Sequence, residues 1–335
     1  MKRLLLLLLT GALLTAAESC DREPCAECAE AYGQHRVTLR LSGNAAGTKV
    51  LDVPSLAEGN VVCSNLFVFD RNGMPVGSYR SADGDFDFYL PEDVYDFVAV
   101  VNKGDLPGAA VSKAELLGSV TTLAENAPGN FVMVGRLDGC RIDSDENLTV
   151  EVARRVAKVS YTIRTAFPAR LADAGFRVDK IYLTNVAGSC LLDERAGSAE
   201  NVSQWYNKMD LESMQEEAPY DLLSGYVGRE MAPSDLLTSG HVFYPYPNDA
   251  ADSHDRQRWS SRCTRFVVQA ELGGRMTWYP VTIDSILGNR HYHIDLTISN
   301  YGVDHPEDRL DDLSAVRISV EAAAWSEGAD LEEVF

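Results

Sequence analysis

The sequence predicts an all-β protein built from two β-sandwich domains in tandem. Short runs of alternating apolar and polar residues recur along the whole chain, and this period of two is typical of half-buried strands. Glycine, proline, asparagine and aspartate separate the runs, as they do in sandwiches made of many short strands. The length of 335 residues fits about two domains of roughly 100–200 residues each.

The first half contains five runs that we assign to strands. They are residues 37–41, 66–69, 86–90, 95–101 and 148–152. The pair Asn72-Gly73 predicts a tight hairpin turn after 66–69. Residues 95–101 are aromatic and β-branched without a breaker, which is typical of a central strand. Ser112 and Glu115 have the spacing of a capping box, so we expect one or two helical turns that reach Leu117.

The second half contains six further strand-like runs. They are residues 156–163, 178–186, 265–272, 278–283, 291–298 and 316–320. Residues 201–217 are polar with few strand formers and predict a loop or a short helix. Residues 238–262 are irregular and contain two prolines. A domain boundary near Ala153 therefore gives an N-terminal sandwich over 35–152 and a C-terminal sandwich over 153–335.

The first twenty residues predict export. Lys2 and Arg3 precede six leucines and a small-residue segment, which is the pattern of a secretory signal, and the apolar run is too short to span a bilayer. Residues 17–20 are similar to a lipobox, so we expect a lipoprotein signal peptide over 1–19 and acylation of Cys20. Residues 20–34 are polar and acidic and form a tether. The alternative is a plain secretory signal in which Cys20 is incidental.

Composition limits the partners of the chain. The formal net charge is −20 at pH 7, which opposes binding to nucleic acid or to an anionic membrane surface by charge. Six cysteines follow Cys20, and an oxidising compartment permits disulfides among them, although the sequence leaves the pairing open. Cys25 and Cys28 form a single C-x-x-C pair without the rest of a zinc set, so we assign them to the tether.

No motif in the sequence predicts an active site. Walker loops, nucleophile elbows and H-E-x-x-H segments are absent, so we expect a protein that is not an enzyme and that holds no cofactor and no metal. Asp83, Asp85 and Asp87 have the spacing that begins a calcium loop, but its later ligands are missing, and we place them on the solvent face of a strand. His291 and His293 lack further zinc ligands and are interpreted as a rim pair.

The order and spacing of several segments carry a family resemblance. These segments are 66–70 (LFVFD), the Asn72-Gly73 turn, 95–102 (YDFVAVVN), 154–159 (RRVAKV), 243–248 (FYPYPN), 278–281 (WYPV) and 289–298 (NRHYHIDLTI). Together they resemble the fimbrillin superfamily, the lipoprotein-derived subunits of type V pili in Gram-negative bacteria. The resemblance implies two transthyretin-like β-sandwich domains. It also implies a structural fimbrial subunit that serves cell adhesion at the surface of the outer membrane.

The resemblance further implies assembly by donor-strand exchange. A sandwich that loses a strand exposes apolar pockets and unpaired backbone groups, which a strand from another subunit fills. Contacts of this head-to-tail kind build filaments because they do not close. The strand to be lost is 35–41, and a trypsin-like protease is expected to cut in the small, polar loop after it, at Lys49. Arg40 and Arg36 are the alternatives, and Lys49 is otherwise an ordinary loop lysine.

The C-terminal strand is the candidate donor. Apolar and polar residues alternate over 316–322, and the chain ends on two apolar residues after a run of acids. The residues that we expect to fill a neighbour's groove are Val316, Ile318, Val320, Trp325, Val334 and Phe335. The alternative is that this segment is only the last strand of its own sandwich.

Two other functions are compatible with the sequence. An anchor subunit of the same family would keep its lipid on Cys20 and hold the base of a pilus. A surface glycan-binding lipoprotein would stack exposed aromatic rings on sugars, although such rings are also common in sandwich interiors. The candidate rings are Trp205, Tyr206, Trp259, Trp278 and Tyr279. The expected partners are therefore other fimbrial subunits, the outer membrane through the lipid, and host or bacterial surface ligands.

Overall fold

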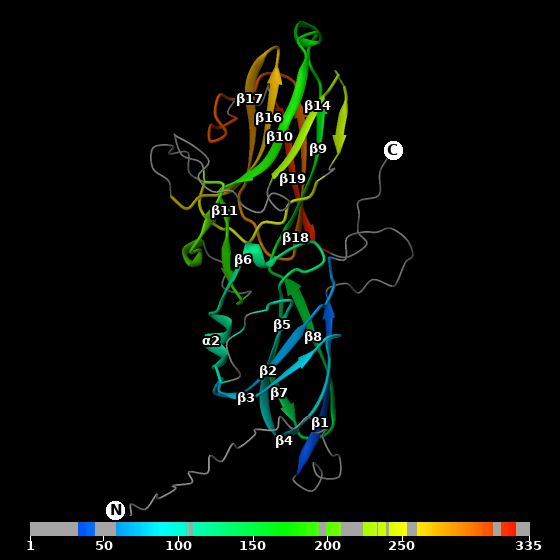
Figure 1. Cartoon of the computed structure of the whole chain (residues 1–335), viewed down its shortest axis with the longest axis vertical. Helices are drawn as coiled ribbons and strands as arrows, with labels where there is room; N and C mark the ends of the chain where they lie inside the picture. The colour runs from blue at the N-terminus through cyan, green and yellow to red at the C-terminus, as the bar shows by residue number, and fades with distance from the viewer. Residues whose placement is uncertain are drawn as a thin grey trace, which may run out of the picture.

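A computed structural model describes residues 33–43, 58–104, 106, 110–193, 199–208, 224–232, 234–238, 241–252, 260–310 and 316–325. Strands dominate these ranges, and their sheets pack as two sandwich-like domains stacked end to end (Figure 1). The described helical elements are α2 (Lys113–Leu117) and the 3₁₀ helices η1 (Leu123–Glu125), η2 (Ala169–Leu171) and η3 (Ala199–Asn201). No helix within the described ranges is long and apolar enough to cross a bilayer. The predicted all-β fold is confirmed.

A seven-stranded sheet forms the first domain. Its strand order is β3-β2-β5-β7-β8-β1-β4. β1 runs parallel to β8, and the other neighbouring pairs of this sheet are antiparallel. The strands are β1 (Gln34–Gly43), β2 (Ser64–Asp70), β3 (Pro75–Ser81), β4 (Asp85–Pro91), β5 (Asp93–Val101), β7 (Met133–Ile142) and β8 (Glu146–Arg154).

The two edges of this sheet meet across an apolar core, so that one continuous sheet forms a sandwich. Tyr79 of β3 and Phe88 of β4 stack with ring centroids 4.3 Å apart, although their strands lie at opposite edges. Phe86, Phe88 and Leu90 are buried because they alternate with residues that face solvent. The period of two in the sequence therefore decides which side chains enter this core.

Local signals in the sequence form the β2–β3 hairpin and α2. The Asp70 carboxylate accepts hydrogen bonds from the backbone N–H groups of Asn72 and Met74, both at 2.8 Å. Gly73 has a φ of 73°, a conformation that favours glycine. Ser112 caps α2 and forms a capping box with Glu115, as predicted. The turn and the helix are therefore set by residues close to them in sequence.

α2 covers the outer face of the first domain's sheet (Figure 1). Leu116 and Leu117 of the helix are buried against side chains of β2, β5 and β7. The members of this second apolar cluster that lie on the sheet are Phe67, Phe69, Val98, Val100 and Val134. The middle strands of the sheet are thus buried on both faces, which explains the continuous apolar run at 95–101.

Two four-stranded sheets form the second domain, in the orders β14-β10-β16-β17 and β15-β9-β18-β19. Their inner faces share one large apolar core. The strands are β9 (Lys158–Thr165), β10 (Phe176–Thr184), β14 (Ser224–Glu230), β15 (Leu236–Thr238), β16 (Thr264–Leu272), β17 (Arg275–Ile283), β18 (Arg290–Ile298) and β19 (Val316–Ala324). A two-stranded ladder joins β11 (Val186–Ala187) to β13 (Trp205–Tyr206).

The two domains are joined by shared structure. β6 (Val120–Thr122), which precedes β7, pairs with β12 (Ser189–Leu191), which follows β11. Tyr246 lies beside this ladder, where its hydroxyl donates to the Thr122 carbonyl at 2.9 Å and the Asn126 amide donates to it at 2.6 Å. Phe131 packs into the core of the second domain. The contact between the domains is therefore apolar and hydrogen-bonded.

The structure also contains strands that the sequence did not predict. β7 and β14 carry charged residues and glycine, and β7 is buried only over its first three residues and its last. Their pairing with apolar neighbours decides their conformation, which is a tertiary effect. The described cysteines, Cys63, Cys140, Cys190 and Cys263, are free thiols. Burial raises the pKa of Cys190 and of Cys263 to about 11, so neither is a reactive thiolate at neutral pH.

Candidate functional site

Strand β1 occupies the centre of the candidate site. It lies between β8 and β4, so both of its backbone edges are paired (Figure 1). Residues 37–43 pair with 146–152 of β8, and residues 34–40 pair with 85–91 of β4. β1 therefore belongs to the interior of the sheet, although it is the first strand in the chain.

The inward side chains of β1 fill the core of the first domain. Val37 and Leu39 are fully buried. Leu39 lies opposite Phe86 on β4 and opposite Leu148 on β8. Removal of β1 would uncover these neighbours and leave both β4 and β8 with unpaired backbone groups. That combination is the kind of groove that accepts an extended peptide.

Two arginines lie on the outer face of β1. The Arg36 side chain donates to Asp87, with 2.9 Å between Nε and Oδ1, and Arg40 is 3.5 Å from Asp85. The hydrogen bond from Arg36 lowers the pKa of Asp87. These contacts confirm that Asp85 and Asp87 lie on the solvent face of β4. They also place Arg36 and Arg40, the alternative maturation sites, within a paired strand.

Several predicted site residues lie outside the described residues. They are Cys20, Lys49, Val334 and Phe335. The described part of the candidate donor is β19, the edge strand of its sheet, antiparallel to β18. In this structure it is the last strand of its own sandwich.

The inner face of β19 is only partly covered. Val316 is 1% exposed, whereas Ile318 and Val320 are 37% and 38% exposed. Both lie opposite fully buried residues of β18, since Ile318 pairs with Leu296 and Val320 with Ile294. β19 thus has the predicted apolar alternation, but the opposite sheet does not enclose its middle.

Trp325, directly after β19, is buried where the two domains meet. Its indole Nε1 donates to Glu58 at 3.0 Å, and the Arg154 guanidinium lies 4.4 Å from the ring centroid. Tyr244 stacks beside it at 5.9 Å, and Phe131 contacts it edge-on at 5.7 Å. The predicted alternation grouped Trp325 with the donor side chains, whereas here its ring anchors the end of β19.

Glu58 was not anticipated from the sequence. It lies in the connection between β1 and β2, and its side chain is 10% exposed. The carboxylate accepts from the Tyr244 hydroxyl at 2.7 Å and lies 3.2 Å from Lys158 Nζ. Burial and this carboxylate raise the pKa of Tyr244. A single glutamate gives no sequence signal, because its partners come from distant segments.

The histidine pair forms a small polar cluster with β9. Ser160 Oγ lies 2.7 Å from His291 Nε2 and 2.8 Å from His293 Nδ1. Among the described residues, no group of three or more histidine, cysteine, aspartate or glutamate side chains is arranged to hold a metal ion. The pair therefore lies on the outer face of the sheet as predicted, bound to a serine.

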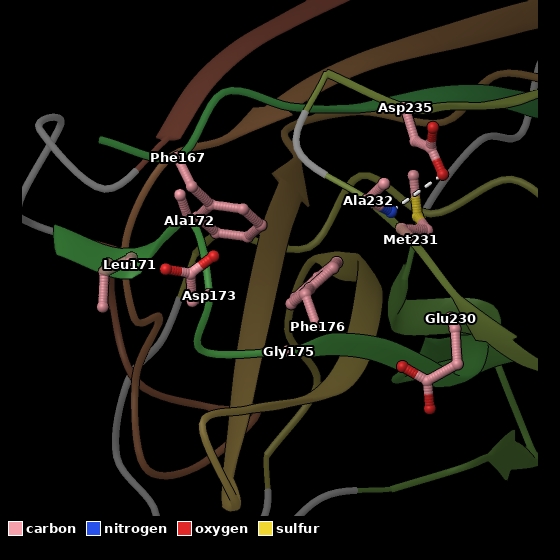
Figure 2. Close-up of a pocket in the computed structure, with 10 residues that line it drawn as sticks. All are labelled: Phe167, Leu171, Ala172, Asp173, Gly175, Phe176, Glu230, Met231, Ala232 and Asp235. Atoms are coloured by element: carbon pink, nitrogen blue, oxygen red, sulfur yellow. Dashed lines mark hydrogen bonds between the residues drawn. The ribbon is translucent and has the colours of Figure 1, made fainter. Parts of the chain in front are cut away.

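A hollow of about 510 Å³ lies between the β9–β10 and β14–β15 connections. Figure 2 shows Phe167 and Asp173 on one side and Met231 and Asp235 on the other, with Phe176 between them. Asp235 accepts from the Ala232 backbone N–H at 2.8 Å. The three acidic side chains that line the hollow, Asp173, Glu230 and Asp235, are exposed or half-buried. Their negative charges disfavour the binding of anions.

The aromatic residues proposed for sugar stacking are mostly inside the protein. Trp205, Tyr206 and Tyr279 are less than 10% exposed and belong to the core of the second domain. Trp278 packs on Tyr182 and Val267 on the outer face of its sheet. Trp259 lies outside the described residues. The described members of this set therefore lie in the core or against the sheet and give no support to a sugar-binding platform.

Solved structures share this arrangement of sheets. A proposed cell adhesion protein from Bacteroides eggerthii superposes with a TM-score of 0.65 at 16% identity, covering 88% of this chain and 97% of the other. A fimbrilin from Porphyromonas gingivalis superposes with a TM-score of 0.64 at 14% identity, covering 87% and 97%. The chain has the fimbrillin fold. No protein-family model and no curated protein matches the sequence.

A fimbrial tip protein has the same fold. Mfa3 from Porphyromonas gingivalis, solved with a C-terminal truncation, superposes with a TM-score of 0.53 at 13% identity, covering 87% of this chain and all of the other. These solved structures are fimbrial and adhesion proteins. At such identities the likeness establishes the fimbrillin fold, and the function must be argued from the strands of this chain.

Proposed function

We propose that this protein is a structural fimbrial subunit that is exported as a lipoprotein and polymerises by donor-strand exchange. The observation that carries the proposal is the position of β1 between β8 and β4, with Val37 and Leu39 fully buried. Loss of this strand opens a groove with apolar pockets and two unpaired ladders. A donor strand from another subunit fills the apolar pockets and pairs with the two open ladders.

The pairing of β1 supports a cut after this strand over a cut within it. Arg36 and Arg40 lie within a strand that is paired on both edges, so a protease reaches them only after local unfolding. Lys49, in the connection that follows, remains our proposed site. Before the cut, acylated Cys20 holds the chain on the outer membrane. After it, the chain joins a fimbrium on the cell surface.

The candidate donor is the C-terminal segment that begins with β19. Among the described residues, no strand pairs with the second edge of β19, and Ile318 and Val320 already expose more than a third of their surface. An edge strand with an incompletely covered apolar face is suited to pairing with another chain. The proposed partners are therefore other fimbrial subunits.

Assembly is tested by cutting the purified protein, which lacks residues 1–19, with a trypsin-like protease. We expect a chain that begins at Val50 and forms polymers, seen by size-exclusion chromatography and electron microscopy. The double variant Ile318→Asp and Val320→Asp should be cut but should not polymerise. Val76→Asp is the matched control, because Val76 is 45% exposed on the other domain. A cut chain that stays monomeric at high concentration contradicts the proposal.

Mass spectrometry of the N-terminus of the surface-assembled protein separates the two fimbrial roles. A start at Val50 supports a polymerising subunit. An acylated Cys20 on the assembled form supports the anchor alternative, in which the lipid is kept and the groove holds the base of the pilus.

A further inference from the structure

A buried carboxylate connects the two segments that change during the proposed assembly. Glu58 lies on the chain between β1 and β2, and Trp325 lies at the end of β19. Their side chains meet at 3.0 Å, across 267 positions of the sequence. Contacts of such long range arise only from the tertiary structure.

The Glu58 carboxylate is occupied on both oxygens. Oε1 accepts from the Tyr244 hydroxyl, and Oε2 accepts from Trp325 Nε1, while Lys158 approaches both. Its backbone carbonyl accepts from Arg154 Nε at 3.0 Å. Arg154 in turn covers one face of the Trp325 ring. Removing Glu58 would leave buried donors of the second domain without an acceptor, which is costly.

Trp325 is a principal anchor of β19 outside its ladder. The middle of the strand is more than a third exposed at Ile318 and Val320, so the buried apolar contacts are at its two ends, Val316 and Trp325. Trp325 also donates from its backbone to the Asn289 carbonyl at 3.3 Å. β19 cannot leave β18 as a whole until the indole has left its surroundings.

Asn102 holds the chain on the downstream side of Glu58. Downstream, the Asn102 side chain donates to the Asn60 carbonyl at 2.7 Å and accepts from the Val62 N–H at 2.8 Å. Upstream, the chain leads through the proposed cut site to β1. A cut at Lys49 would break the covalent connection between Glu58 and β1 and would leave the Asn102 contacts in place.

We propose that Glu58 and Trp325 form a latch that keeps β19 in its own domain and that weakens when the chain is cut upstream of Glu58. The latch rests on the proposed function, because it regulates exchange only if β19 or its extension is the donor. Glu58 is a positioning residue in this scheme. It makes donor release depend on maturation, so that uncut chains do not polymerise early.

Hydrogen exchange tests the latch on the monomer. We compare Glu58→Gln and Trp325→Phe with wild type, both uncut and cut, at concentrations too low for assembly. Glu58→Gln replaces one acceptor by a donor, and Trp325→Phe keeps an aromatic ring but removes the N–H. Glu151→Gln is the control, because Glu151 is exposed on β8. The amides of β16, a central strand in the opposite sheet of the same domain, report opening of the whole second domain.

In the uncut variants we expect the amides of β19 to exchange about tenfold faster or more, with β16 unchanged, because the loss of a charge-assisted hydrogen bond opens the strand locally. Cutting should accelerate the exchange of the β19 amides in wild type and add little to it in the variants. Unchanged β19 exchange in both variants, or an equal rise in the exchange of β16, overturns the latch.

Polymerisation of the cut proteins is measured separately. A wild type that never polymerises contradicts the proposed function but leaves the exchange result as evidence for the latch. Polymerisation by uncut Glu58→Gln, which wild type lacks, supports control of assembly by the latch. If cut chains polymerise but uncut wild type and uncut Glu58→Gln polymerise to the same extent, control of assembly by the latch is overturned.

Discussion

Leu39 offers a direct measure of how strongly β1 is held. Leu39→Ala removes three carbon groups from a fully buried side chain, a transfer term of about 2.4 kcal/mol at about 0.8 kcal/mol per group. Leu148 flanks it on β8, which is paired further into the sheet. Phe86 flanks it on the edge strand β4, where the neighbouring Phe88 packs on Tyr79 of β3. Because both neighbours are held in place, the site closes only in part and a cavity term is added. We expect a total loss of about 3–4 kcal/mol in the free energy of unfolding.

Urea unfolding followed by circular dichroism measures this loss. With a slope of about 1–3 kcal/mol per molar urea, the midpoint should fall by about 1 M or more. The four tryptophans lie at positions 205, 259, 278 and 325, so their fluorescence follows the second domain separately. Thr38→Ala, one residue away on the outer face, is the control and should change stability by less than about 1 kcal/mol. Equal effects of the two substitutions would refute the placement of β1.

Three further predictions concern the charge, packing and junction of the protein. The pKa of Asp87 is lowered in the folded state, so its contribution to the free energy of unfolding is present above about pH 4 and disappears as the pH falls through the lowered pKa. Amide exchange in β1 should therefore depend less on acid in Asp87→Asn than in wild type. Gly135→Ala places a Cβ 2.2 Å from the Glu151 carbonyl oxygen and should cost about 2–3 kcal/mol in a thermal melt, whereas Gly104→Ala meets open space and should be tolerated. Tyr246→Phe removes the hydroxyl shared by Thr122 and Asn126 at the junction and should cost about 1–3 kcal/mol in urea unfolding, while Tyr79→Phe should have little effect.

Patterns among residues that are close in sequence predicted much of the fold. The alternation at 86–90 placed Phe86 and Phe88 in the core and left Asp85 and Asp87 on the surface. The Asn72-Gly73 turn and the Ser112 capping box were also predicted, because both depend on residues within a few positions of each other. β7 and β14 were missed, since their residues gain strand structure from neighbours distant in sequence.

The candidate site was predicted in part. The sequence indicated β1 and β19 as strands but did not place them in their sheets. Whether a strand lies at an edge or between two others depends on the topology, and the position of β1 between β8 and β4 gives it its proposed role. The partial exposure of Ile318 and Val320 likewise depends on how far the opposite sheet extends.

The amino-acid sequence by itself determined the all-β fold class, the turns and the side chains of each strand that face the core. These follow from the pleat of a strand and from local backbone preferences. Only the tertiary structure decided that Glu58 and Trp325 meet, that Trp325 anchors β19, and that β1 is paired on both edges. Their side chains are ordinary in sequence and acquire a role through partners brought from both domains. A buried carboxylate needs partners to offset its desolvation, and the fold alone places them around it.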